Sequence, residues 1–249
     1  MSARGGYAGR QSVSCRCLRA RSVRPYNARV AASGSIALIF DMDNTLIGSR
    51  IDFPEIRRAL IALLHEAGAA DETDEALMRR ALAQLVALGT AHDVEHGTTL
   101  VPRMWETIEA HESIGLQDAL PLDNARNVLE ALRARGFRIA VLTNNARDSA
   151  LGALRAADLL QVVEVLVARG DVHSLKPAGD GVTEAARRLG EVERLYVIGD
   201  SWIDGAAAAE AGARFIAYRR SAQDLRDRGV RPWRTIAHLA ELLTIDLSG

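Results

Sequence analysis

Five short apolar runs, separated by stretches of helical periodicity, constrain the fold of this chain more than any other feature of its sequence. Each run has four to seven residues, the length of a strand, and is continuous rather than alternating. Continuous runs of this kind are typical of strands buried on both faces of a parallel sheet. The predicted strands are Ile36–Phe40, Phe137–Leu142, Val162–Ala168, Leu195–Ile198 and Arg214–Ala217.

Helical periodicity accompanies these strands, with apolar residues recurring every three or four positions. Strands that alternate with helices place helices on both faces of a sheet, so the pattern predicts an α/β fold with three layers and a Rossmann-like parallel sheet. A last stretch, Thr235–Leu243, has helical spacing and predicts a C-terminal helix. The other predicted helices of the core are Leu122–Arg135, Asp148–Ala157, Gly181–Leu189 and Ile203–Ala211.

The connection between the first two strands is too long for a single crossover helix. It has 96 residues, whereas the other gaps between strands have 15 to 26. We therefore predict a small α-helical domain at residues 48–120, inserted into an α/β core formed by residues 34–47 and 121–249. It would lie above the carboxyl end of the first strand, where the chain leaves the sheet.

Three helices are expected in this insert. The first is marked by Asp52 as N-cap, with Glu55 three residues later. The other two follow from apolar spacing at Thr73–Leu88 and from about Leu100 to His111.

Residues 1–33 contain seven arginines and no acidic residue, and they have no apolar periodicity. This composition predicts a disordered arm. Two explanations are open: an organellar transit segment, or a translated stretch upstream of the true start. We favour the second, because glycines and Pro25 oppose an amphipathic helix. We accordingly expect a cytoplasmic protein, with an organellar location as the alternative.

The rest of the chain is acidic, with 24 basic and 32 acidic residues. Nucleic-acid backbones require a concentrated basic face, so this balance argues against a nucleic-acid partner. No apolar run approaches the ~20 residues that span a bilayer, so we expect no membrane partner. Only one of the 31 basic residues is a lysine, Lys176, which suggests that this position requires an ammonium group.

Polar side chains follow several of the predicted strands at the point where each strand ends. Ligands of open parallel sheets bind at these carboxyl ends, so we expect the side chains to converge on one crevice. They are Asp41, Asp43, Thr143, Asn144, Lys176, Asp200 and Asp204.

Electrostatics predicts a cation at this crevice. Two carboxylates ~4 Å apart repel each other by about 4 kcal/mol at an effective dielectric constant of 20. Lys176 supplies one positive charge, and ligands that are all oxygen select a hard divalent ion, here Mg²⁺. Because Mg²⁺ retains waters and bridges to phosphate, the crevice is suited to a phosphoryl group.

These residues give the chain a resemblance to the haloacid dehalogenase (HAD) superfamily of phosphotransferases, from about Ile36 to the C-terminus. The insert resembles the helical C1-type cap of phosphoglycolate phosphatases and sugar-phosphate mutases. The chain departs from the commonest pattern at Asn44, where many members have Gly, and at Gly179, where a second Pro is frequent. The four signature motifs are Asp41-Met42-Asp43-Asn44-Thr45-Leu46, Thr143, Lys176-Pro177, and Gly199-Asp200 with Asp204.

The resemblance implies that Asp41 is a nucleophile that forms an aspartyl-phosphate. Asp43 would protonate the leaving group and then deprotonate the attacking water, and Lys176 would hold Asp41 in its anionic form. Asp43 would also present its backbone carbonyl to the metal.

It also implies the other ligands of this site. Asp200 would bind the metal beside Asp41, and Asp204 would bind it or orient a metal-bound water. Thr143, Lys176 and the backbone N–H of Asn144 would hold the phosphoryl oxygens. Asn144 and Asn145 also fit a simple turn.

The resemblance implies an Mg²⁺-dependent phosphatase that hydrolyses a small phosphorylated metabolite, because dehalogenases lack an Asp two residues after the nucleophile. The alternatives are a sugar phosphomutase and a non-catalytic binding module. Phosphoglycolate, sugar phosphates and nucleotides are all compatible substrates. The sequence is also compatible with any oligomeric state. The cap residues considered for substrate selection are Arg50, His92, His96, Arg103, Trp105 and His111.

Overall fold

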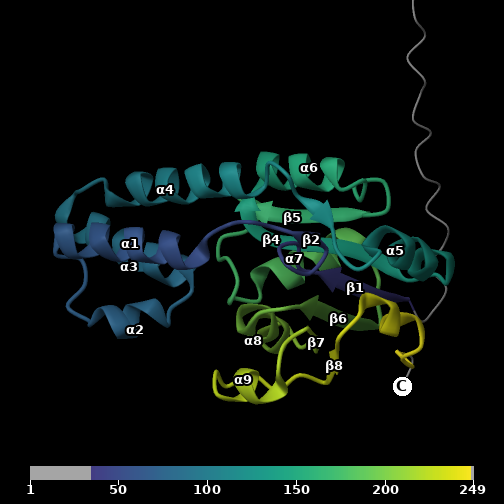
Figure 1. The fold of residues 1–249 in the computed structure, drawn as a ribbon. Coiled ribbons are helices and arrows are strands. Elements are labelled where there is room, and N and C mark those ends of the chain that lie inside the picture. Colours follow the sequence, from purple (N-terminus) through teal and green to yellow (C-terminus); the bar gives the residue numbers. More distant parts are fainter. Residues whose placement is uncertain (1–34, 248–249) are drawn as a thin grey trace, which may run out of the picture. The chain divides into compact units, whose positions relative to one another are not determined.

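A computed structural model describes residues 35–247 of the chain. The predictions for residues 1–33 therefore lie outside the described residues. In the described part, six parallel strands form one sheet in the order β5-β4-β1-β6-β7-β8 (Figure 1). These strands are β1 (Ile36–Phe40), β4 (Arg138–Ala146), β5 (Val165–Arg169), β6 (Arg194–Gly199), β7 (Arg214–Tyr218) and β8 (Arg234–Ile236).

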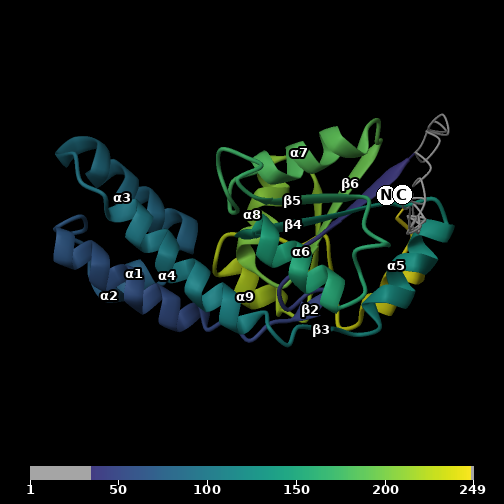
Figure 2. The same cartoon turned by 90° about the horizontal axis from the view of Figure 1, so that it is seen from above.

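Helices cover both faces of this sheet, which confirms the three-layer α/β prediction. Alternate residues of β1 point to opposite faces: Leu38 belongs to one core and Ile39 to the other. The first core includes α5 (Ala125–Ala134) and α6 (Arg147–Ala156), and the second includes α7 (Asp180–Leu189) and α8 (Trp202–Glu210). Figure 2 shows α6 and α7 on opposite sides of the sheet.

The strand order reverses at β1. From β1 the chain adds β4 and β5 on one side, and it then crosses to β6 on the other side. The crevice of a doubly wound sheet lies at such a reversal, outside the carboxyl ends of the strands. Here the strands β4, β1 and β6 end at this crevice.

The residues between β1 and β4 contain four helices, which are α1 (Phe53–Ala67), α2 (Asp74–Met78), α3 (Leu82–His96) and α4 (Leu100–Gly115). The chain leaves the sheet through β2 (Ile47–Gly48) and returns through β3 (Leu120–Pro121), which pairs with β2 in antiparallel fashion. We retain the division at residues 48 and 120 as a prediction. The Asp52 side chain accepts a hydrogen bond from the Glu55 N–H at 2.9 Å, which confirms the predicted helix start.

The single helix predicted at Thr73–Leu88 is wrong, because α2 and α3 are separate helices. Ala81 between them has extended backbone (φ −67°, ψ 153°), and its N–H donates to the Gln84 side chain at 2.9 Å. The break allows Leu77 and Leu85 both to be fully buried. Alanine is the best helix former, so nothing local in the sequence marks this turn.

The C-terminal helix predicted at Thr235–Leu243 is also wrong. Ile236 lies instead in β8 and pairs with Tyr218, and a 3₁₀ helix follows at Leu239–Leu243. The two buried residues of that short helix, Leu239 and Leu242, are three apart, which fits three residues per turn. A short helix, α9 (Ala222–Arg226), precedes β8.

The third predicted strand starts at Val165 rather than at Val162. The Val162 N–H donates to the Leu159 carbonyl at 3.1 Å, so Val162 is buried from a turn. Within residues 35–247, no helix combines the length and the apolar character needed to cross a membrane.

Candidate active site

The carboxyl ends of β4, β1 and β6 open into a cavity of about 280 Å³. Asp41 follows β1 directly, and Lys176 reaches the cavity from the loop between β5 and α7. All the side chains that the sequence places at strand ends line this cavity: Asp41, Asp43, Thr143, Asn144, Lys176, Asp200 and Asp204.

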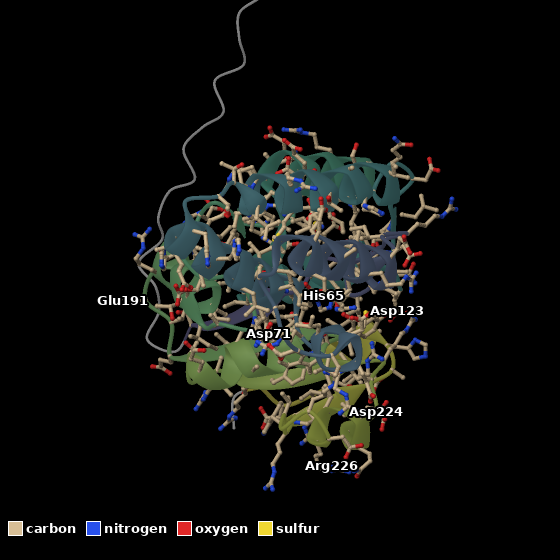
Figure 3. All side chains as sticks on the ribbon, turned by 90° about the vertical axis from the view of Figure 1, so that its left-hand side faces the viewer. His65, Asp71, Asp123, Glu191, Asp224 and Arg226 are labelled. Atoms are coloured by element: carbon tan, nitrogen blue, oxygen red, sulfur yellow. The ribbon has the colours of Figure 1, made fainter. Side chains whose placement is uncertain are left out.

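A second cavity, of about 390 Å³, lies at the edge formed by α9 and β8. Arg226 of α9, labelled in Figure 3, marks this edge, whereas His65 marks α1. None of the residues proposed for catalysis lines this second cavity. The cavity at the strand ends is therefore the candidate active site.

Lys176 lies at the centre of an ion-pair network. Its Nζ donates to Asp41 Oδ1 at 2.5 Å, to Asp204 Oδ1 at 2.7 Å and to the Leu142 carbonyl at 3.2 Å. Lys176 is only 3% exposed. Its three acceptors lie around one point, a geometry that suits an ammonium group better than a planar guanidinium.

These ion pairs keep Lys176 protonated. Burial alone would lower the pKa of Lys176, but the carboxylates of Asp204 and Asp41 raise it above its ordinary value.

The carboxylates carry more negative charge than Lys176 compensates. Burial raises the pKa of Asp41 well above its usual range; Lys176 lowers it in part, and the carboxylates of Asp204 and Asp200 add to the rise. Burial and the Asp204 carboxylate raise the pKa of Asp200 to about 6, although Arg220 lies 3.6 Å from Asp200 Oδ2. The cluster therefore favours an additional positive charge.

The geometry of these acids suits a divalent cation. Carboxylate oxygens of Asp41, Asp200 and Asp204 all lie within 4.8 Å of one another. An all-oxygen donor set with uncompensated charge fits Mg²⁺. The side chain of Asp43 does not belong to this cluster, so the prediction for Asp43 as a ligand concerns its backbone carbonyl alone.

Asp204 is held by the turn that begins α8. Its Oδ2 accepts a hydrogen bond from the Ser201 N–H at 3.1 Å. Gly199 lies directly against it, and a Cβ at position 199 would come within 2.4 Å of the Asp204 carboxylate. Glycine is thus required at the end of β6 for the acid to reach Lys176.

Asn44 occupies the position where many members of the resembled superfamily have Gly. Its φ is 58°, in the left-handed region that glycine and asparagine tolerate best. The departure from the family pattern therefore preserves the turn that follows Asp41 and Asp43.

Asn145 is a site residue that the sequence interpretation missed. Its Nδ2 donates to Asp43 Oδ2 at 2.7 Å, and both residues are buried. Asp43 Oδ1 has no hydrogen-bond partner among the described residues. Burial raises the pKa of Asp43, and the hydrogen bond from Asn145 offsets part of this rise. Thr143 and Asn145 are two apart in β4 and therefore share a face, a signal that could have identified Asn145.

We expect an Asn145→Ala variant to lower kcat/KM for alkyl phosphates roughly tenfold to a hundredfold, because Asp43, the predicted proton donor, loses the group that orients it. The kcat/KM for p-nitrophenyl phosphate should fall much less, since its leaving group needs no proton. Equal losses on the two substrates would contradict a role through Asp43.

Thr143 and Asn144 both hold the chain around the cavity. The buried Thr143 Oγ1 accepts from the Asn145 N–H at 3.1 Å. The Asn144 side chain donates to the Lys176 carbonyl at 2.9 Å and accepts from the Lys176 N–H at 3.0 Å. The Asn144 side chain thus positions Lys176, and contact of its backbone N–H with phosphate stays a prediction.

The insert forms the opposite wall of the cavity, with Phe53, Arg57, Leu82, Trp105, Ile108 and Glu112. Of the six cap residues considered from the sequence, Trp105 alone is among the lining residues. The other five do not line the cavity: Arg103 pairs with Glu66, for example, and His92 stacks on His96.

Glu112 and Arg169 join the insert to the sheet. Arg169 donates to both carboxylate oxygens of Glu112, at 3.1 and 2.9 Å, and its guanidinium lies 4.5 Å from the Trp105 ring centre. The Ala146 N–H also donates to Glu112, at 3.3 Å. The Glu112 side chain is only 4% exposed, so this is a buried ion pair between α4 and β5.

An Arg169→Met variant is expected to lower the free energy of unfolding by roughly 3 to 5 kcal/mol, because it leaves Glu112 buried without a counter-charge. The double variant with Glu112→Gln should recover much of this loss. Thermal unfolding of the two single variants and the double variant would measure the coupling. Additive losses would contradict a direct ion pair.

Comparison with known proteins agrees with this geometry. The family model of haloacid dehalogenase-like hydrolases matches residues 37–212. The phosphoglycolate phosphatase of Nitrosospira multiformis is 30% identical over 185 residues, which cover 71% of this chain and 80% of that protein. The chain belongs to the haloacid dehalogenase-like hydrolase family.

Solved structures share the fold. A Bacteroides fragilis protein provisionally described as a haloacid dehalogenase-like hydrolase matches with a TM-score of 0.60 and 21% identity, over 84% of this chain and 99% of that one. A Thermotoga maritima protein provisionally described as a β-phosphoglucomutase matches with a TM-score of 0.55 and 22% identity, over 84% and 96% of the two chains.

Proposed function

We propose that this enzyme hydrolyses a small phosphate monoester in two steps, through a phosphoryl group carried by Asp41, and that it requires Mg²⁺. It is a phosphoric monoester hydrolase of the haloacid dehalogenase-like family. The observation that carries the proposal is the Lys176 network, which holds a carboxylate of Asp41 at the strand ends that line the cavity.

In the first step an Asp41 oxygen attacks phosphorus, and the bond from phosphorus to the ester oxygen breaks. Asp43 gives its proton to the departing alkoxide, which leaves as an alcohol. The raised pKa of Asp43 and its free Oδ1 suit this role. Lys176 compensates the charge of Asp41 and of the phosphoryl oxygens near it.

In the second step water attacks the phosphorus of the aspartyl-phosphate. Asp43, now a carboxylate, accepts a proton from that water, and the bond from Asp41 to phosphorus breaks. Inorganic phosphate leaves, and both aspartates return to their starting states. Asn145 would keep the Asp43 side chain directed at the reacting centre in both steps.

Asp41, Asp200 and Asp204 would hold the Mg²⁺, together with the Asp43 carbonyl, and the bound ion would neutralise charge on the phosphoryl oxygens. Removal of the metal with a chelator should abolish turnover, and addition of Mg²⁺ should restore it.

The test is phosphate release from a panel of small monoesters, with and without Mg²⁺. Phosphoglycolate is the first candidate, because the relatives that are about 30% identical are described as phosphoglycolate phosphatases. The alternative, a sugar phosphomutase, would isomerise a hexose phosphate with little phosphate release. Absence of both reactions would overturn the proposed function.

A further inference from the structure

Arg57 differs from the other cations of the active-site cavity. Among the residues that the structure describes, four positively charged side chains line the cavity, and three of them pair with carboxylates. Within residues 35–247, Arg57 has no ion pair. The three paired residues are Arg169 with Glu109 and Glu112, Lys176 with Asp41 and Asp204, and Arg220 with Asp200.

The few contacts of Arg57 leave part of its guanidinium unused. It lies half-buried in the first turns of α1, and its Nε donates to the Arg80 carbonyl at 3.0 Å. Its Nη1 makes a long contact of 3.5 Å with the Phe53 carbonyl. Among the described residues, Nη2 has no hydrogen-bond partner. Such a fork can bind a carboxylate or a phosphate oxygen pair.

The electrostatic surroundings of Arg57 favour an anion. Burial and the neighbouring Arg228 lower the pKa of Arg57, so its positive charge is poorly compensated in the free protein. The strand-end wall of the cavity is acidic and would bind the phosphoryl group in the proposed function, whereas Arg57 belongs to the insert on the opposite wall. An anion at Arg57 would thus belong to the leaving group.

The same wall limits what that leaving group can be. The neighbours of Arg57 in the lining include the apolar side chains of Phe53, Leu82, Trp105 and Ile108. The cavity of about 280 Å³ lies just below the usual range of ligand sites, which is roughly 300 to 1,000 Å³. A short leaving group with one charged end fits this wall better than a polyhydroxylated sugar.

We propose that Arg57 binds a second anionic group of the substrate, a carboxylate or a second phosphate on the leaving group, and thereby selects the ester. This inference rests on the proposed phosphatase activity. It assigns to Arg57 a role in specificity and leaves the chemistry to the residues at the strand ends.

Matched esters test the selection. Phosphoglycolate and 2-hydroxyethyl phosphate have similar size, but only the first has a charged leaving group; propane-1,3-diol bisphosphate tests a second phosphate. We expect kcat/KM of the native enzyme to be roughly tenfold to a hundredfold higher for the better anionic ester than for 2-hydroxyethyl phosphate. This is the range that charge-assisted hydrogen bonds give. Arg57→Gln should remove the preference by raising KM for that ester and leave 2-hydroxyethyl phosphate unchanged.

The control variant is Arg58→Gln. Arg58 is exposed, pairs with Glu55 on the same helix and does not line the cavity. It should keep the native preference. Equal kcat/KM values for charged and neutral esters would overturn the inference, as would an Arg57→Gln variant that weakens both alike, since Arg57 would then serve only to hold the loop at Arg80.

Binding separates this inference from the proposed function. If the native enzyme releases no phosphate from any ester, the phosphatase proposal fails. Titration calorimetry of phosphoglycolate and 2-hydroxyethyl phosphate with the native protein and Arg57→Gln still measures recognition. A preference for the charged ester that disappears in the variant would support the anion site, and similar affinities in both proteins would overturn it.

Discussion

An Asp41→Asn variant is expected to lose phosphatase activity by roughly 10⁴-fold or more, the scale on which removal of a nucleophile acts in other enzymes. The amide has the size of the carboxylate but cannot attack phosphorus. Initial rates of phosphate release from the best ester, at saturating Mg²⁺, would measure the loss.

The fold of this variant should survive. Burial and the nearby carboxylates disfavour a negative charge at position 41, so a neutral side chain is expected to leave the midpoint of thermal unfolding unchanged or raised in metal-free buffer. Lys176 keeps its second partner, Asp204, at 2.7 Å.

Asp118→Asn is the matched control for this variant. The Asp118 side chain is 78% exposed, and its ion pair with Arg50 has a distance of 3.7 Å. The control should retain native activity. An Asp41→Asn protein that is folded and keeps a substantial part of the native rate would exclude Asp41 as the nucleophile.

The residues at the strand ends could be predicted because their positions depend on local pattern and topology alone. A buried parallel strand is recognisable from its apolar run, and the carboxyl ends of parallel strands converge. Asp41 and Asp200 are therefore brought together by elements that the sequence specifies locally. The lysine stands out by its rarity, and its three acceptors explain why an ammonium group is present at this position.

Contacts between segments far apart in sequence could not be predicted in the same way. Glu112 and Arg169 are 57 residues apart, and neither has a local signal that indicates the other. Arg57 resembles any exposed helical arginine until the cavity and its missing counter-charge are known. Ala81 and Ile236 were assigned to helices because periodicity over a few residues does not distinguish a turn or a strand from a helix when tertiary packing decides.

A Lys176→Met variant is expected to lose both activity and stability. The buried carboxylates of Asp41 and Asp204 would face each other without the ammonium group between them. Removal of one partner from a buried ion pair costs roughly 3 to 5 kcal/mol, and the loss of a group that stabilises transition-state charge costs about 10² to 10³ in kcat. Thermal unfolding and rates at saturating Mg²⁺ would measure the two effects.

Mg²⁺ should reduce the difference in stability between the Lys176→Met variant and the native protein. A ligand that binds the folded state but not the unfolded state stabilises the protein by about 2.7 kcal/mol at a concentration a hundredfold above its Kd. Because the variant has one positive charge fewer at the cluster, its unfolding midpoint should rise more on addition of Mg²⁺ than that of the native protein. An equal rise in both would contradict a metal bound among these carboxylates.

The catalytic and stabilising roles of Lys176 can be separated by a second substitution. Asp204→Asn in the Lys176→Met protein removes one of the two facing charges, so the unfolding midpoint in metal-free buffer should recover while turnover stays lost. Arg187→Met, which removes an exposed cation paired with Glu184, is the control and should change neither quantity.

Lys176→Arg keeps the charge, but a planar guanidinium cannot place three donors around one point toward Asp41, Asp204 and the Leu142 carbonyl. Full activity in the arginine variant would show that charge alone suffices at this position, and the rarity of lysine in this chain would then have no chemical cause.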